Sequence, residues 1–187
     1  MYHTHSSIIC AVLLATALSV GAQEAVVAGK AVDRAALAAF VLDQAPAESH
    51  TVAELRAADA QPGDRVRVRA QVGGRNPPWV PGRAMMLLAD AEPLAAACTS
   101  TCGAPWDFCS APVDKLQAHT TVVRWLDGDG QPQALGFPDI VELAPLSTVV
   151  VTGVVADVGD PRALVIDADG IYLEDQGPYA ALMQRSQ

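Results

Sequence analysis

The feature that most constrains the fold is a strict alternation of charged and apolar residues, RVRVRAQV, at residues 65–72. The valines and Ala70 fall on one face of an extended chain and the arginines on the other, because successive side chains of a strand point to opposite sides. A helix with this pattern could not gather its apolar residues on one side. The stretch therefore predicts a β-strand with a buried face and a basic, solvent-facing one.

Four later segments also have the composition of strands and are separated by turns and loops. They are AMMLLAD (84–90), TVVRWLD (121–127), TVVVTGVVAD (148–157) and ALVIDADGIYLE (163–174). FPDIVELAPLS (137–147) predicts a brief helical crossing between the third and fourth strands. The predicted fold is therefore mainly β, with a five-stranded Greek-key barrel over residues 62–174.

A helical and linker segment is expected at residues 23–61, before the barrel. Thr51 is followed three residues later by Glu54, the pattern of a capping box that satisfies free N–H groups at a helix start. Pro62 and Gly63 are expected to stop that helix. Residues 175–187 form a polar tail.

Residues 1–22 have the pattern of a secretory signal peptide. The apolar run IICAVLLATAL is too short to span a bilayer comfortably, and small residues precede a cleavage point after Ala22. The absence of Lys and Arg before that run departs from the pattern. We expect an exported protein, periplasmic or extracellular, with no transmembrane segment in the mature chain. Disulfides persist in such compartments.

The chain is acidic, with a formal net charge of −9, which disfavours a nucleic-acid partner. The strongest basic feature is a row of three arginines, Arg65, Arg67 and Arg69, on one face of the first strand. A ligand face is one interpretation, with Trp125 as a stacking partner. A solvated outer face is the simpler one.

The stretch CTSTCGAPWDFCSAP (98–112) lies in a long irregular insertion, residues 91–118. It holds the three cysteines expected in the mature chain, Cys98, Cys102 and Cys109. An odd number favours one disulfide and one free thiol, with Cys98 or Cys102 linked to Cys109. Such a link would restrict the loop in the unfolded chain.

Two alternatives for these cysteines stay open. Three thiolates with His119 could make a tetrahedral zinc site or a copper(I) site, shielded by Trp106. Their spacing meets the common zinc pattern only once. Thiol redox chemistry is the third alternative, although CTSTC lacks the two-residue gap of thioredoxin-like motifs.

The strand order, with GDRVRVRAQVGG at its start and STVVVTGVVAD and ALVIDADGIYL at its end, resembles an OB-type (oligonucleotide/oligosaccharide-binding) domain. VGGR, GRAMMLLAD and the PWDFC segment further resemble uncharacterised exported bacterial proteins with an OB-like core. The OB resemblance implies a ligand face on strands two and three and the flanking loops. Trp106 and Asp107 of the PWDFC segment are also candidate ligand contacts.

DGDG (127–130) and DADG (167–170) resemble the start of a calcium loop but lack its further ligands, so both are expected to be turns. The chain carries no nucleophile elbow, Walker loop or HExxH motif. We expect a non-enzymatic binding or accessory module without a cofactor, whose partner is a small molecule or a protein. A metal-handling or thiol-redox protein and an oligonucleotide-binding domain are the alternatives.

Overall fold

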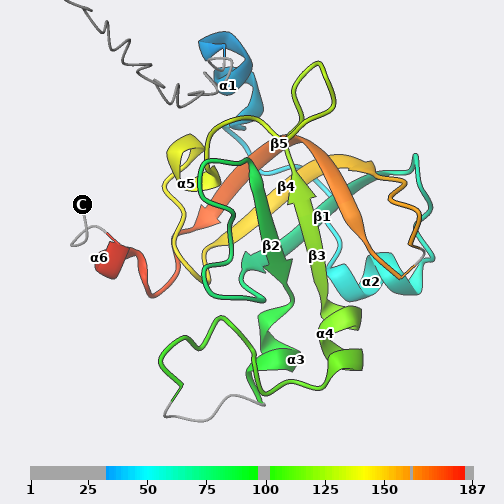
Figure 1. Ribbon diagram of the computed structural model, residues 1–187, viewed down its shortest axis with the longest axis vertical. Helices are drawn as coiled ribbons and strands as arrows, with labels where there is room; N and C mark the ends of the chain where they lie inside the picture. Colours follow the sequence, from blue (N-terminus) through cyan, green and yellow to red (C-terminus); the bar gives the residue numbers. More distant parts are fainter. Residues whose placement is uncertain (1–32, 97–101, 161, 184–187) are drawn as a thin grey trace, which may run out of the picture.

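The computed structural model describes residues 33–96, 102–160 and 162–183, and its strands form one closed β-barrel (Figure 1). Around the barrel the order is β1-β2-β3-β5-β4, and β4 closes it against β1. The β3–β5 pair is parallel and the others are antiparallel. The strands are β1 Arg65–Val72, β2 Met85–Ala89, β3 Thr120–Arg124, β4 Thr148–Val155 and β5 Val165–Asp175.

The predicted β fold with five strands is confirmed. In β1 the valines and Ala70 are buried and the arginines are exposed, as the alternation requires. The inner faces of the strands fill the barrel with apolar side chains. The predicted signal peptide, residues 1–22, lies outside the described residues.

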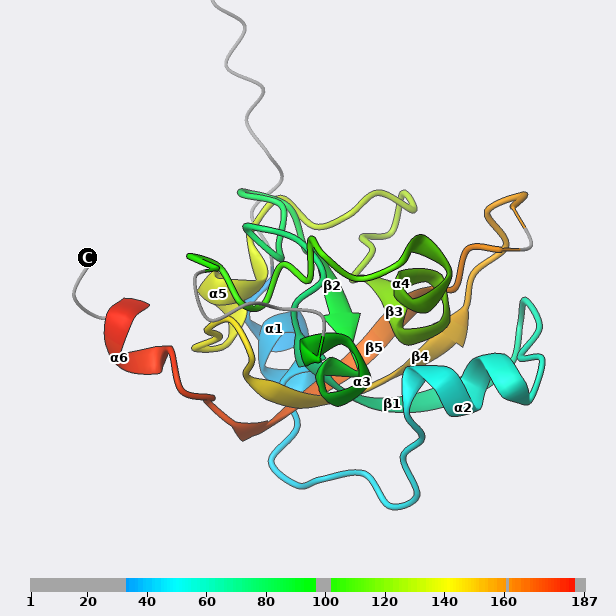
Figure 2. The ribbon, with the colours of Figure 1, turned by 90° about the horizontal axis from the view of Figure 1, so that it is seen from below.

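Short helices cover the two ends of the barrel (Figure 1). At the upper end, α1 and α5 insert Phe40 and Phe137 into the core. At the lower end, α2, α3 and α4 lie together, and Figure 2 shows α2 running beside β1. No helix in the described ranges is both long and apolar enough to cross a membrane. The helices are α1 Arg34–Phe40, α2 Val52–Ala57, α3 Ala91–Ala95, α4 Val113–His119, α5 Phe137–Ile140 and α6 Ala180–Met183.

Trp125 belongs to this core. Its side chain is buried, and its ring stacks on Phe40 with 4.2 Å between centroids and 14° between planes. It lies at the end of β3 that α1 covers, so it does not reach the arginines on the outer face of β1. Trp125 therefore packs in the core, and its ring does not lie beside the arginines on the outer face of β1.

Two local predictions are wrong. The helix that begins after Thr51 ends at Ala57, ahead of Pro62, and the chain turns at Asp59, whose φ of 53° is left-handed. The DADG segment is not a turn but part of β5. Its two aspartates occur within a strand because both pair with arginines: Asp167 with Arg124 on the adjacent strand β3, and Asp169 with Arg65 on β1, which lies beyond β4.

The turn predicted at DGDG is confirmed. The Asp127 carboxylate accepts hydrogen bonds from the N–H groups of Asp129 and Gln131. The insertion at 91–118, expected to be irregular, carries a short helix at each end, α3 and α4. These two helices hold both ends of the cysteine-containing segment against the lower end of the barrel.

Candidate functional site

Two of the three cysteines lie in the described part of the insertion. Cys102 is half-buried and Cys109 is exposed, and both are free thiols. The structure therefore contains neither predicted disulfide to Cys109. Cys98 lies outside the described residues.

Aromatic residues hold the insertion instead. Phe108 is 1% exposed and packs against Ala89 and Leu94 in a small apolar cluster beneath the barrel. The ring of Trp106 meets Tyr179 edge-on, with 4.9 Å between centroids. Burial of a large aromatic side chain stabilises a loop by several kcal/mol, on the order of a disulfide. These contacts account for an ordered segment that has no cross-link.

The VGGR and PWDFC motifs pack directly against each other. The N–H of Gly74 donates to the Trp106 carbonyl at 2.8 Å. A Cβ on Gly73 would lie 3.0 Å from that carbonyl oxygen and 3.1 Å from the Phe108 ring. Gly73 is therefore required by close packing rather than by a turn. Asp107 lies in the same segment and closes a local turn, its N–H donating to Ala104.

The predicted metal site does not form among the described residues. Across the described ranges, no three His, Cys, Asp or Glu side chains come close enough to hold an ion. The Nδ1 atom of His119 lies 3.2 Å from the Asp90 carboxylate. The site with all three cysteines depends on Cys98, which is outside these ranges.

The arginine row is largely neutralised. Arg65 pairs with Asp169 at 2.6 Å, and Arg69 makes two hydrogen bonds to Glu174 at 2.7 and 2.8 Å. These bonds from Arg69 hold the pKa of Glu174 below its ordinary value. In the described part of the chain, the guanidinium of Arg67 has no hydrogen-bond or ion-pair partner.

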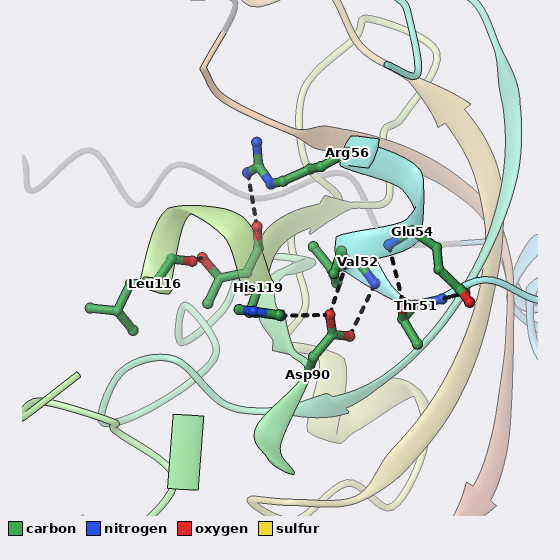
Figure 3. Close-up of polar contacts among 9 residues, drawn as sticks. Thr51, Val52, Glu54, Arg56, Asp90, Leu116 and His119 are labelled. Carbon is green, nitrogen blue, oxygen red and sulfur yellow. Dashed lines mark hydrogen bonds and ion pairs between the residues drawn. The ribbon is translucent and has the colours of Figure 1, made fainter. Parts of the chain in front are cut away.

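The densest polar network joins α2 to β2 and β3 (Figure 3). Asp90, just after β2, accepts from the N–H groups of Val52 and Ala53 at 3.0 and 2.9 Å. The same carboxylate contacts His119, at the end of α4. Asp90 thus satisfies the first two free donors of α2 from a distant part of the chain.

The predicted capping box completes this helix start. The Thr51 hydroxyl accepts from the Glu54 N–H at 3.1 Å, and the Glu54 carboxylate accepts from the Thr51 N–H at 2.8 Å. Together with Asp90, these bonds occupy every backbone donor from Thr51 to Glu54. The N-terminus of α2 therefore has no donor left for a ligand.

Arg56 is the second residue whose side-chain hydrogen bonds connect α2 to the barrel. Its guanidinium donates to the carbonyls of Thr120 and Arg162, both at 3.0 Å. Its Nε is buried with no hydrogen-bond partner in the described ranges. Burial lowers the pKa of Arg56, because the charged form loses hydration. This cation is thus held at the base of α2 by neutral carbonyls.

Four surface grooves border α2. One, of about 620 Å³, lies between α2 and β1 and is lined by Leu55, Arg65 and Arg67. A second, of about 580 Å³, lies between α2 and residues 155–164. A third, of about 250 Å³, crosses β2 and β3 at Leu87 and Val122. A fourth, of about 390 Å³, flanks the Asp90–His119 pair.

The chain matches no family model, curated protein or solved structure in these comparisons. Neither Asp90 nor Arg56 was predicted from the sequence as a functional residue. Asp90 gives no local signal, because its partners Val52 and Ala53 are 38 and 37 residues away. Arg56 looks like an ordinary basic residue in the last turn of a helix.

Proposed function

We propose that this protein is an exported, non-enzymatic binding module with an OB-like barrel, and that its ligand surface is the set of grooves around α2. The observation that carries the proposal is their common position, because all four border this one short helix. Ligand sites are concave and few in a protein. Several grooves converging on a helix that is tied to the barrel favour a binding surface with a rigid centre.

The barrel order supports the OB-like assignment. Its closure in the order β1-β2-β3-β5-β4, with a parallel β3–β5 pair, suits the Greek-key barrel expected from the sequence. OB-type barrels bind ligands on strands two and three and on the loop between strands four and five. The groove of about 250 Å³ lies over β2, β3 and that loop, with Arg56 and Arg162 among its lining residues.

The Asp90–His119 pair resembles part of a catalytic dyad, but its bonding favours a structural role. Both oxygens of Asp90 accept backbone N–H groups of α2. The nearby Thr51 hydroxyl is occupied by the capping box. A carboxylate committed to two amides is poorly placed to orient a catalytic histidine while a substrate reacts. We therefore assign this pair to holding α2.

The free thiols keep a second candidate open. Cys109 is exposed and Cys102 is half-buried, so the insertion could bind a soft metal or exchange disulfides. Native mass spectrometry of the exported protein, with thiol counting, tests this. A mass heavier by one zinc or copper ion, with thiols protected until chelation, would move the functional centre to the insertion.

Heteronuclear NMR tests the main proposal. We would titrate the mature protein with short peptides, oligosaccharides and dicarboxylates and record which amides shift. We expect shifts to gather around α2. An added Arg side chain at Ala163, between two grooves, should abolish binding there, whereas Ala134→Arg on the far loop should not. Shifts confined to Trp106 and its neighbours would contradict the proposal.

A further inference from the structure

The edge of β1 opposite β4 is only partly covered. β1 pairs with β4 from Arg65 to Gln71 but with β2 only at Gln71 and Val72. Between these, a single residue of the preceding segment, His50, forms an isolated parallel bridge at Val68. The first residues of β1 therefore lie at a sheet edge, where backbone groups can pair with another chain.

The hydrogen bonds of this bridge define which groups are open. The His50 N–H donates to the Arg67 carbonyl, and the Arg69 N–H donates to the His50 carbonyl, both at 2.8 Å. In a strand, the N–H and C=O of one residue point toward the same side, and successive residues alternate between the two sides. Arg65, Arg67 and Arg69 therefore all point their backbone groups toward this edge. The N–H and C=O of Arg65 and the N–H of Arg67 are the groups that remain open. None of the three has a partner among the described residues.

The preceding segment cannot cover these groups. In a parallel ladder, the next residue to pair would be Glu48, two positions before His50. Glu48 has a φ of 56°, a left-handed conformation that turns the chain away from β1. Figure 2 shows this connection looping away from the barrel before α2 begins.

The groove of about 620 Å³ lies at this uncovered edge. Leu55, Ala58 and Ala60 form an apolar wall on the side of α2. Arg67 also lines the groove and is the arginine of β1 without an acidic partner in the described ranges. The groove thus combines open backbone groups, an apolar wall and one unpaired positive charge.

We propose that an extended peptide binds this edge of β1 by strand addition, with its backbone on Arg65 and Arg67 and one carboxylate side chain on the Arg67 guanidinium. Strand addition draws affinity from main-chain hydrogen bonds and selectivity from the side chains that meet pockets. This inference rests on the proposed binding function and names its groove and ligand class. Glu48 and Asp64 also line the groove, so a single acid suits it better than an acidic run.

The probe is a fluorescein-labelled peptide of about eight residues, alternating valine and threonine, with one central glutamate. Fluorescence anisotropy measures its binding to the mature protein. Arg67→Ala removes the charge and keeps the N–H, and we expect binding to weaken about 3-fold to 10-fold. A second probe carries lysine in place of the glutamate. Wild-type protein should bind this lysine probe no more tightly than the Arg67→Ala variant binds the glutamate probe.

Arg67→Pro removes the open N–H as well as the charge. It should weaken binding about 5-fold beyond Arg67→Ala, since one main-chain hydrogen bond contributes about 1 kcal/mol. Proline is tolerated where a strand's N–H faces solvent, so the β1–β4 ladder should survive. Arg83→Glu, an exposed charge change outside the groove, is the control and should leave binding within about twofold.

Hydrogen exchange gives a second test that needs no variant. Bound peptide should slow exchange of the Arg65 and Arg67 amides of wild type, because these N–H groups gain partners. Absence of binding by wild type, equal binding by Arg67→Pro and Arg67→Ala, or no added protection would each overturn the proposal. If ligands shift only amides near Arg56 while the peptide fails, strand addition fails and the binding function stands.

Discussion

α2 and the cysteine-containing insertion lie at the same end of the barrel, and both bury apolar side chains, Val52 and Leu55 in α2 and Phe108 in the insertion, but they differ in their polar side-chain contacts (Figure 1). In addition to its buried side chains, α2 is held by polar side-chain bonds, with Asp90 accepting from its first amides and Arg56 donating to two carbonyls. The insertion is tied by the burial of Phe108 and the ring contact of Trp106. Polar ties need correct geometry at each bond, whereas apolar burial scales with area. The two regions should therefore respond differently to substitution.

The largest effect is expected from Phe108→Ala, which empties the apolar cluster beneath the barrel. A buried phenylalanine truncated to alanine costs about 3–5 kcal/mol of unfolding free energy. Urea denaturation measures this loss. Val113→Ala in the same insertion, where the side chain is 70% exposed, should cost under about 0.5 kcal/mol. A Phe108 variant as stable as the Val113 variant would mean that burial does not hold the insertion.

Asp90→Ala is expected to rank second, at about 2 kcal/mol, because it strips the acceptor from two amides of α2. Asp114→Ala removes the same charge from an exposed position and should change stability by under about 0.5 kcal/mol. Hydrogen exchange should report faster exchange at Val52 and Ala53 in the Asp90 variant. Unchanged exchange there would show that the carboxylate does not hold the helix.

Gly73→Ala probes the contact between VGGR and PWDFC and should cost about 1 kcal/mol. The new Cβ would press on the Trp106 carbonyl and the Phe108 ring, and overpacking of this kind destabilises. Gly103→Ala is the matched control, because its Cβ would meet no described atom within 4 Å. Equal melting temperatures for the two variants would argue against this packing.

The smallest effect concerns pH. The Arg69 hydrogen bonds lower the pKa of Glu174 in the folded protein. A lowered folded-state pKa gives stability that is present above the unfolded value, about 4.3, and is lost as pH falls through the folded-state value. Glu174→Gln should therefore lose under about 1 kcal/mol at neutral pH, since the pair is solvent-exposed. The difference in urea midpoint between this variant and wild type should shrink as pH falls below the unfolded value, and a difference that stays constant with pH would contradict this origin.

Local sequence patterns predicted the barrel strands and the start of α2. The alternation in β1 and the Thr51–Glu54 box each act within a few residues, so they are visible in sequence. The Asp90 cap and the Gly73–Phe108 contact were missed, because each joins segments more than thirty positions apart. Neither of the two expected disulfides to Cys109 is present, and counting cysteines could not show which thiols lie close together in the fold.

Because Asp90 caps α2 from a later part of the chain, this contact also affects when α2 can form during folding. α2 has six residues, too few to persist alone, and its capping box supplies only part of the first turn. During synthesis the ribosome adds the residue that completes this turn 38 positions after Val52, a delay of about 2–8 s at ordinary elongation rates. Until β2 has been made and has paired, residues 52–57 can only sample the helix. α2 is therefore expected to be a late element of folding, although it precedes every strand in the chain.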